Sequence, residues 1–498
     1  TAFICGDDSL SYAELGDQSR RLAAFLQQEW GLKKGDRVAI ALPNVLQFPV
    51  TLVCNILAGF VQVNVNPQYT PLEMQHQLND SGAEILVTGG VALETFRQIA
   101  ADTGVKKVIE VSLDGSAAGP AIEGVAKTMF FEAIAKYSAH DFAAPDINAD
   151  DLLFLQYTGG TTGLSKGAML SHGNLAANIV QTNAWLYASA PATDTRVITA
   201  LPLYHIFALT VNSLVHMVVG AENVLVTNPG DMDGFVAIMA KHPPTFITGV
   251  NTLYNGLVNN AHISDVDFSG LRHAVGGGAP VQKVVSDKWE AITGKMIMEG
   301  YGLSETSPVV TMTPGSLREF KSAIGLPAPD TDISIRDDNG AEVPQGESGE
   351  LCVKGPQVMR GYWGQEDNTS DVMTPDGYFK TGDVGVMDPD GFFHIVDRKK
   401  DMVLVSGFNV FPNEIEAVVA GMGAILECAC IGVPDDRTGE AVKVFAVQQP
   451  GAVVSEDDVR DYCKGKLTGY KVPRHVVFID ALPKSTVGKI LRRELRDY

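Results

Sequence analysis

Cysteine, basic charge and long apolar runs are all scarce in this chain of 498 residues. No two of its cysteines stand in a Cys-x-x-Cys pair; they are Cys5, Cys54, Cys352, Cys428, Cys430 and Cys463. A disulfide framework and a structural zinc site are therefore not expected, and a reducing cytoplasm fits this cysteine usage. With 38 Lys and Arg against 59 Asp and Glu, the formal net charge is −21. Such a charge argues against general binding to nucleic acid.

Two apolar stretches are too short or too interrupted to cross a membrane. Residues 45–65 contain polar residues and a proline, and residues 206–220 number only 15 and include polar side chains. A spanning helix needs about 20 apolar residues. We therefore expect buried helices or a pocket wall, while peripheral contact with the inner face of the cell membrane stays open. The sequence begins at Thr1 inside a foldable pattern, so a preceding targeting segment also stays open.

Short β-rich runs alternate with helical stretches along the first half of the chain. Ser11–Glu14 has the pattern of a capping box and predicts a helix after it. The predicted buried strands are residues 38–42, 85–88, 107–111, 197–200, 245–248 and 271–275. This alternation predicts an α/β protein with layered sheets that bind ligands at the strand ends.

The pattern changes after Lys321. Turn signals separate short predicted strands at residues 333–336, 349–354 and 392–396, which indicates a small β-rich subdomain over about residues 321–397. Beyond it, predicted helices at 414–422 and 455–467 alternate with predicted strands at 427–433 and 442–448. The final hundred residues could therefore form a separate small α+β domain.

A phosphate-binding loop is predicted at Tyr157–Gly167, directly after an apolar run. Backbone N–H groups of small residues can surround a polyphosphate, and Lys166 adds positive charge. A Walker A pattern cannot be aligned here, which disfavours a P-loop kinase or ATPase. A plain surface turn is the alternative, but ten consecutive small, polar or basic residues after a buried strand argue against it.

Two further motifs contain glycine: Glu299–Glu305, and Gly276–Pro280, which follows the predicted strand 271–275. Glycines let the backbone approach a flat ligand, and a carboxylate such as Glu305 suits Mg²⁺. Tyr301 can stack on a purine, although it could equally be a core aromatic residue.

Charged residues gather at the end of the predicted β-rich subdomain. Asp383 can hold a ribose diol through paired hydrogen bonds, and Arg398 can reach the same sugar or the α-phosphate. The run Asp397–Asp401 would by itself read as a solvated linker, which agrees with a hinge between domains. Within Leu404–Asn409, Gly407 offers a passage for a narrow substituent.

The last motif, Pro483–Arg493, carries Lys489 almost at the end of the chain. A lone lysine there is usually a solvated tail residue. Its Gly-Lys setting, considered with the phosphate motifs upstream, favours a functional role instead.

In this order and spacing, the motifs resemble the adenylate-forming (AMP-binding) superfamily of acyl-CoA synthetases, luciferases and peptide-synthetase adenylation domains. The resemblance runs from near Thr1 to Tyr498, and Asp397–Glu416 and Leu467–Pro473 are especially similar to bacterial long-chain fatty-acid–CoA ligases. It implies a large N-terminal domain over residues 1–397, a hinge at 398–400, a small mobile α+β domain over 401–498 and a site between the two domains. The implied reaction consumes ATP and joins a fatty acid to coenzyme A through an acyl-adenylate, releasing AMP and pyrophosphate.

The resemblance also implies site residues. The loop around the β- and γ-phosphates would contain Thr158, Gly159, Gly160, Thr161, Thr162, Gly163 and Lys166. Further nucleotide-binding residues would be Gly278, Glu299, Gly300, Tyr301, Gly302, Ser304, Asp383, Ile395, Arg398 and Asn409. At the position of Asn409, other members carry different polar or aromatic residues. The implied catalytic residues are Lys489, His205 and Glu305, and the implied Mg²⁺ ligands are Thr158 and Glu305.

Two half-reactions are implied, with one domain rotation between them. Attack of the carboxylate on the α-phosphate makes the mixed anhydride, and Lys489 helps to stabilise the negative charge of that transition state. The C-terminal domain would then rotate about Lys400 and bring Ser406 and Gly407 to the tunnel for the pantetheine arm of coenzyme A, whose thiol displaces AMP.

The substrate is inferred from the stretch Leu203–Leu209, which contains no Asp. Peptide-synthetase domains place an Asp here against the substrate amino group, so an uncharged acyl tail is favoured; its length is not readable. One rival is an enzyme that stops at, or diverts, the adenylate, such as a fatty-acyl-AMP ligase or a luciferase-like oxygenase. A nucleotide-binding pseudoenzyme is another, and the joint presence of Glu305, Asp383 and Lys489 argues against it. The oligomeric state, monomer or homodimer, stays open.

Overall fold

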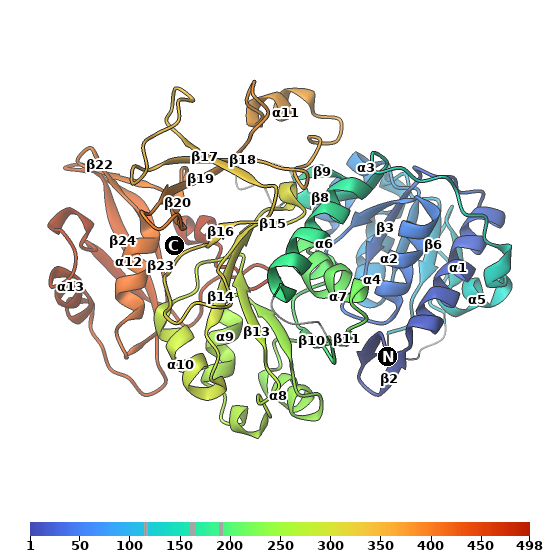
Figure 1. The fold of residues 1–498 in the computed structure, drawn as a ribbon, viewed down its shortest axis with the longest axis horizontal. Coiled ribbons are helices and arrows are strands. Elements are labelled where there is room, and N and C mark those ends of the chain that lie inside the picture. The colour runs from blue at the N-terminus through green and yellow to red at the C-terminus, as the bar shows by residue number, and fades with distance from the viewer. Residues whose placement is uncertain (114, 116–117, 159–164, 189–192) are drawn as a thin grey trace.

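The computed structural model describes residues 1–113, 115, 118–158, 165–188 and 193–498. Strands of this part of the chain form four sheets, two large ones and two small ones. Figure 1 shows the N-terminal sheet with its helices in blue, a second sheet in green and yellow, and the two small sheets in orange to red. The expected α/β class, with a large N-terminal part and a smaller C-terminal one, is confirmed.

The first large sheet is built from the N-terminal third of the chain. Its seven strands lie in the order β7 (Ala126–Met129), β6 (Lys107–Glu110), β5 (Ile85–Thr88), β3 (Arg37–Ala41), β4 (Val61–Asn64), β8 (Leu152–Thr158) and β9 (Lys166–Ser171). All pairs are parallel except β8 with β9. Val38 and Ile40 face one hydrophobic core while Ala39 and Ala41 face another, as strand alternation requires.

Helices cover both faces of this sheet. The core on the Val38 side includes residues of α1 (Tyr12–Gln28), α2 (Gln47–Ala58) and α5 (Phe130–Lys136). The core on the other side includes residues of α3 (Pro71–Ser81) and α4 (Gly90–Ile99). The predicted capping box is confirmed, because the Glu14 amide donates to the Ser11 hydroxyl and the Ser11 amide donates to the Glu14 carboxylate.

The second large sheet has nine strands. Their order is β16 (Leu326–Pro327), β15 (Val309–Met312), β14 (Ile297–Gly302), β13 (His273–Gly277), β12 (Phe246–Gly249), β10 (Arg196–Thr199), β11 (Glu222–Leu225), β1 (Phe3–Cys5) and β2 (Asp8–Leu10). Strand β1 has two partners: it pairs antiparallel with its neighbour in sequence, β2, and parallel with the distant β11. The first strand of the chain thus belongs to the second sheet, while the helix that follows it packs on the first.

Helices again cover both faces of the nine-stranded sheet. One core includes residues of α8 (Met232–Lys241), α9 (Asn251–Val258) and α10 (Lys283–Thr293). The opposite core includes residues of α6 (His172–Tyr187), a π-helix (Ala208–Leu214) and α7 (Val215–Val218). Of the two apolar stretches, residues 206–220 form the π-helix and α7, and residues 45–65 form α2 and the strand β4. The expected buried helices are therefore present, together with a strand that was not predicted. No helix in the described part of the chain has the length and apolar run that a bilayer-spanning segment needs.

The two small sheets lie on either side of the expected hinge. The first is antiparallel, with β17 (Asp332–Arg336), β18 (Gly349–Lys354), β19 (Phe379–Met387) and β20 (Phe393–Arg398), and is accompanied by α11 (Glu366–Val372). The second contains β22 (Phe408–Val410), β21 (Val403–Val405), β24 (Gly439–Gln448), β23 (Ile425–Asp435) and β25 (His475–Phe478). Helices α12 (Pro412–Ala420) and α13 (Glu456–Lys464) pack in its core.

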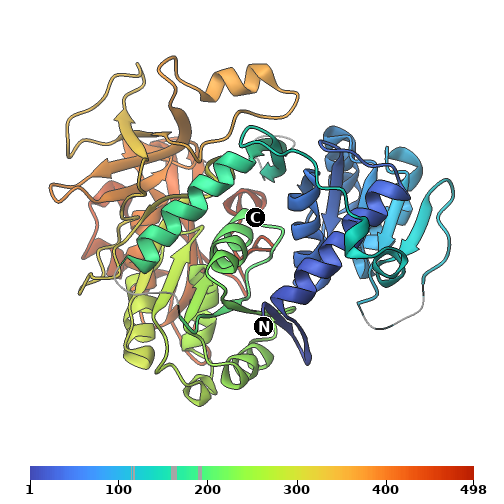
Figure 2. The same cartoon turned by 45° about the vertical axis from the view of Figure 1, so that its right-hand side comes forward.

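The chain returns to the middle of the molecule after β25, where Figures 1 and 2 both show its red C-terminal segment beside the nine-stranded sheet. The first small sheet ends at Arg398 and the next strand begins at Val403. Arg398, Lys399 and Lys400 between them are exposed, which agrees with the expected hinge. The domain boundaries themselves stay a prediction.

Candidate functional site

Lys489 lies on a tight turn that reaches back to the nine-stranded sheet. The amide of Ser485 donates to the Lys489 carbonyl at 2.7 Å, and the Lys489 amide donates to the Ser485 hydroxyl at 3.1 Å. The turn is fastened to the large domain, because the Thr252 hydroxyl at the start of α9 donates to the Gly488 carbonyl at 2.9 Å. A residue almost at the C-terminus is therefore held among residues from the middle of the chain.

Gly278 of the large domain lies close to this lysine. It follows β13 with φ of +77°, and a Cβ added there would stand 2.9 Å from Lys489 Cε. Only glycine adopts that backbone conformation without strain and leaves this space. The adjacent Gly277 is equally crowded, since an added Cβ would meet the Phe207 ring at 3.1 Å. The predicted role of Gly276–Pro280 as a close-approach turn is thus physically explained.

Three charged side chains act on the Lys489 ammonium. Burial lowers the pKa of Lys489 to about 8, and Arg398 adds to this effect, while Asp383 and Glu305 oppose it. The effect of burial and of Arg398 on the Lys489 pKa is therefore larger than the opposing effect of the two carboxylates. A desolvated cation of this kind is ready to pair with an anionic ligand.

Glu305 lies in a short 3₁₀ segment, Ser304–Thr306, after β14. Its carboxylate is buried and accepts a hydrogen bond from the Tyr362 hydroxyl at 2.8 Å. Burial raises the pKa of Glu305, and the Tyr362 bond opposes that rise. Tyr362 was not predicted from the sequence, because nothing local marks a tyrosine whose partner is 57 positions away.

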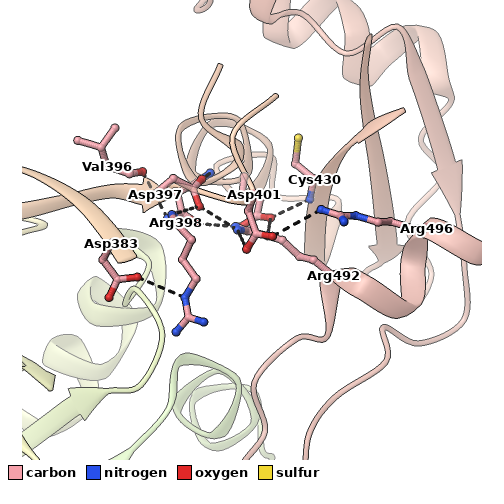
Figure 3. A network of polar contacts seen from close by, with 10 residues as sticks. Asp383, Val396, Asp397, Arg398, Asp401, Cys430, Arg492 and Arg496 are labelled. Carbon is pink, nitrogen blue, oxygen red and sulfur yellow. Dashed lines mark hydrogen bonds and ion pairs between the residues drawn. The ribbon is translucent and has the colours of Figure 1, made fainter. Parts of the chain in front are cut away.

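Asp383 and Arg398 meet across the pair β19–β20. They are register partners, and Arg398 Nε lies 3.4 Å from Asp383 Oδ1. Figure 3 shows the two side chains facing each other. The Tyr301 hydroxyl donates to the other oxygen, Oδ2, at 2.7 Å. The structure therefore brings together three residues predicted separately for the nucleotide sugar and base.

The remaining predicted residues of β13–β14 line the same strand ends. Gly300, Tyr301 and Gly302 close strand β14, and Ser304 stands beside Glu305. Glu299 is buried and accepts from the Val281 amide at 3.3 Å, and burial raises its pKa to about 8. A neutral Glu299 below that pH is a hydrogen-bond donor as well as an acceptor.

His205 lies in the loop between β10 and the π-helix. The Phe207 amide donates to His205 Nδ1 at 3.3 Å, so the proton of the neutral ring belongs on Nε2. Burial lowers the pKa of His205 to about 3, and Lys489 adds to this effect. The ring is therefore neutral at physiological pH and offers Nε2–H as a donor.

Two amide side chains missed in the sequence fix this loop. The Leu203 amide donates to Asn44 Oδ1 at 2.8 Å, and the Asn44 side chain donates to the carbonyl groups of Thr199 and Leu201. The Gln156 side chain donates to the Tyr204 carbonyl at 3.2 Å. Both act over more than forty sequence positions, and no local pattern marks them.

The predicted phosphate loop is only partly described. Gly159, Gly160, Thr161, Thr162 and Gly163 lie outside the described residues. Thr158 and Lys166 are register partners at the ends of β8 and β9. Lys166 Nζ lies 2.7 Å from Asn368 Oδ1 of α11 and 5.2 Å from the centre of the Tyr362 ring. The lysine thus stands on the side of the site where Tyr362 holds Glu305.

The residues predicted for coenzyme A occupy a separate place. Ser406 and Gly407 form the turn between β21 and β22, both with positive φ, of +52° and +83°. Asn409 is exposed on β22 opposite Leu404. Ser406 borders a pocket of about 420 Å³ that is also lined by Arg460, Lys464, Tyr470 and Arg474 of the C-terminal sheet and its helices. Ile395, by contrast, lies in β20 beside Gly385, close in sequence to Arg398.

Comparison with known proteins agrees with this geometry. Residues 1–363 match the family "AMP-binding enzyme", and residues 414–489 match "AMP-binding enzyme C-terminal domain". A relative from Yersinia pestis named long-chain-fatty-acid–CoA ligase is 49% identical over 515 residues, covering 100% of this chain and 91% of the relative.

Solved structures share the fold of this chain. ATP-bound MatB from Rhodopseudomonas palustris is 33% identical and superposes with a TM-score of 0.89, over 100% of this chain and 95% of that one. The apo form of MatB superposes less well over the same shares of the chains, with a TM-score of 0.77 and 33% identity. The turn that brings Lys489 to Gly278 thus occurs in an overall arrangement nearer to the ATP-bound form. The family models match most of this chain, and the relative from Yersinia pestis is 49% identical over all of it. The chain therefore belongs to the AMP-binding enzymes.

Proposed function

We propose that this protein joins a fatty acid to coenzyme A in two half-reactions, with ATP as the co-substrate. The observation that carries the proposal is the meeting of Lys489 with Glu305, Asp383 and Arg398 at the strand ends of the large domain. The name of the Yersinia pestis relative supports a long-chain acid as the substrate.

In the first half-reaction, a carboxylate oxygen attacks the α-phosphorus of ATP. A bond from that oxygen to phosphorus forms, the bond to the bridging oxygen breaks, and pyrophosphate leaves. Lys489 stabilises the negative charge that builds up around the phosphorus. Asp383, with Arg398 and Tyr301 beside it, orients the ribose, and His205 donates Nε2–H to the acid.

Mg²⁺ fits the site as a partner of the phosphates. Mg²⁺ is usually held by one or two carboxylates together with substrate phosphate oxygens and water. Glu305 supplies one buried carboxylate, and Thr158 at the end of β8 would add a hydroxyl. The bound ion would neutralise phosphate charge. The raised pKa of Glu305 is what an unbound acidic ligand in a desolvated site would have.

In the second half-reaction, the thiol sulfur of coenzyme A attacks the acyl carbonyl carbon. A carbon–sulfur bond forms, AMP leaves, and the thiol proton passes to solvent. In the described structure, Lys489 lies near Glu305 and Asp383, whereas Ser406 and Gly407 lie in a separate place, on the β21–β22 turn. A rotation about Lys400 would exchange them, which makes residues 398–400 the hinge of the proposal. Lys400→Pro should then preserve adenylate formation and impair thioester formation.

The acyl chain is proposed to bind along the π-helix that follows His205. Phe207, Val211 and Val215 pack in an apolar core with Val275 and Met298 of the sheet. Short π-helical turns frequently occur at functional sites. The carboxyl end of a fatty acid at His205 would direct its apolar tail along this face.

ATP-to-AMP conversion with acids of two to eighteen carbons, with and without coenzyme A, tests the proposal. AMP and pyrophosphate release that requires coenzyme A and favours long acids is expected. AMP formation that is indifferent to coenzyme A would favour an adenylate-only enzyme. Absence of AMP with every acid, aromatic acids included, would overturn the proposal.

We place the enzyme in the cytoplasm, consistent with six cysteines that are all free thiols. Peripheral contact with the inner face of the cell membrane stays a prediction, which co-sedimentation with vesicles of anionic and neutral phospholipids would test. Sedimentation velocity would distinguish monomer from homodimer.

A further inference from the structure

Asp397 stands where two parts of the chain meet. Its backbone belongs to β20 and pairs with Val384 of β19, inside the first small sheet. Its carboxylate is bound from beyond the hinge: the Asn413 amide donates to Oδ2 at 3.0 Å, and Arg492 Nη1 lies 3.1 Å from Oδ1. The side chain is only 1% exposed. Figure 3 shows Asp397 and Arg492 in contact, with Arg398 next to them.

Arg492 is fixed to the C-terminal sheet. Its Nε and Nη2 donate to the two oxygens of Glu416 at 3.0 and 2.8 Å, and Glu416 in turn accepts from the Cys430 amide of β23 at 2.7 Å. Asp401, just after the hinge, lies 3.8 Å from Arg492. Burial alone would lower the pKa of Arg492, but the Glu416 and Asp397 carboxylates outweigh it and raise the pKa. Arg492 is therefore a permanently charged group inside a cluster of carboxylates.

The Asp397 contacts span the expected hinge. If the C-terminal part rotates about Lys400, Asp397 stays with its sheet, while Arg492 and Asn413 move away with α12 and the C-terminal segment. Two hydrogen bonds to a buried carboxylate are then lost. Breaking a buried ion pair is costly unless water replaces the partner. The contact therefore favours the arrangement in which Lys489, three positions before Arg492, faces Glu305 and Asp383.

We propose that Asp397 and Arg492 are positioning residues that form a clasp across the hinge, holding Lys489 in place for adenylate formation and opening for thioester formation. Neither residue touches the reacting atoms, so both act through the position of Lys489. The inference rests on the proposed function, because it assumes two half-reactions served by two arrangements of the C-terminal part.

The first test compares the half-reactions in Asp397→Asn, which removes the charge and keeps the size. ATP–pyrophosphate exchange should fall about tenfold or more, since hydrogen bonds to charged groups are the stronger class. Thioester formation from supplied acyl-adenylate should stay within about twofold of wild type or increase. An equal fall in both half-reactions would reduce Asp397 to an ordinary core residue and overturn the clasp.

The matched control is Asp376→Asn. Arg336 Nη1 and Nη2 lie 3.0 and 2.6 Å from the two Asp376 oxygens, but both residues belong to the same side of the hinge. Loss of this ion pair should leave the ratio of the two half-reactions unchanged. If Asp397→Asn fails to fold, Arg492→Lys provides the second variant, because an ammonium keeps the charge but cannot bridge Asp397 and Glu416 together.

Tryptic cleavage after Arg398, Lys399 or Lys400 gives a readout that needs no activity. Cleavage of the native protein at these exposed residues should be about tenfold faster in Asp397→Asn than in wild type, because the open arrangement is more populated. Unchanged cleavage would contradict the clasp. If wild type made no AMP with any acid, the proposed function would fail while the cleavage comparison still decided whether the clasp exists.

Discussion

The lowered pKa of Lys489 predicts an unusual alkaline limit on adenylate formation. Burial brings the pKa of this lysine to about 8, well below its ordinary value of 10.5. Because the charged form stabilises the transition state, activity should be full below pH 8 and should be lost as pH rises through 8. The acid side should be free of a histidine step near 6.5, because the His205 pKa is about 3.

The magnitude follows from the titration of a single group. With a pKa of about 8, about 90% of Lys489 is protonated at pH 7 and about 10% at pH 9. The kcat/KM for ATP, which reports the free enzyme, should therefore fall about tenfold between these two values. The limit on kcat should lie at higher pH, since bound phosphates favour the ammonium form.

ATP–pyrophosphate exchange is the appropriate assay, because it omits coenzyme A, whose thiol titrates in the same range. Lys489→Arg is the matched variant: its guanidinium stays charged, so whatever activity it retains should not fall between pH 7 and 9. A wild-type profile that stays flat to pH 10, or a fall of equal size in the arginine variant, would refute the reasoning.

Three further changes probe the site. Gly278→Ala should lower ATP–pyrophosphate exchange at least about tenfold, because its Cβ would stand 2.9 Å from Lys489 Cε and its φ of +77° adds strain of about 1–2 kcal/mol; normal exchange would show that the lysine adapts. Tyr362→Phe removes the hydrogen bond to Glu305, so the pKa of Glu305 should rise further and the Mg²⁺ concentration for half-maximal exchange should increase several-fold, more at pH 6 than at pH 8. Val211→Phe enlarges a buried side chain of the π-helix itself and should shift the preferred acid to a shorter chain in the AMP-release assay, whereas Val180→Phe, on the exposed side of α6, should not. An unchanged chain-length profile in Val211→Phe would place the acyl tail elsewhere.

Local patterns predicted the strands closely. Residues 85–88 form β5 as predicted, and residues 107–111 form β6 with one residue fewer. The prediction was less accurate at β13, which runs from His273 to Gly277 and not over 271–275. Gly276 and Gly277 extend this strand because they pair with Glu299 and Gly300 of β14. A side chain at Gly277 would meet the Gly300 carbonyl at 3.0 Å and the Phe207 ring at 3.1 Å, so glycine is favoured there. Tertiary packing, and not β propensity, decides that boundary.

The candidate site was predictable where its chemistry is local. The glycine turn Gly276–Pro280 and the motif Pro483–Arg493 are local sequence patterns, so Gly278 and Lys489 could be proposed from the sequence alone. Partners that lie far apart could not be found this way. Asp397 and Arg492 are 95 positions apart; the sequence placed Asp397 in a charged linker and Arg492 in the C-terminal motif, with nothing to connect them. Only the fold shows that both are buried against each other.

The pairing of β1 with β11 affects how the chain is made. Phe3 finds its partner at Asn223, so during synthesis β1 has no parallel neighbour until about 220 more residues have been added. At about 5–20 residues per second, that interval lasts about 10–40 s. During that time Phe3 and Ile4, which pack in the core when folded, remain exposed. Synthesis therefore leaves an early window in which a chaperone that binds short apolar segments could protect the nascent chain.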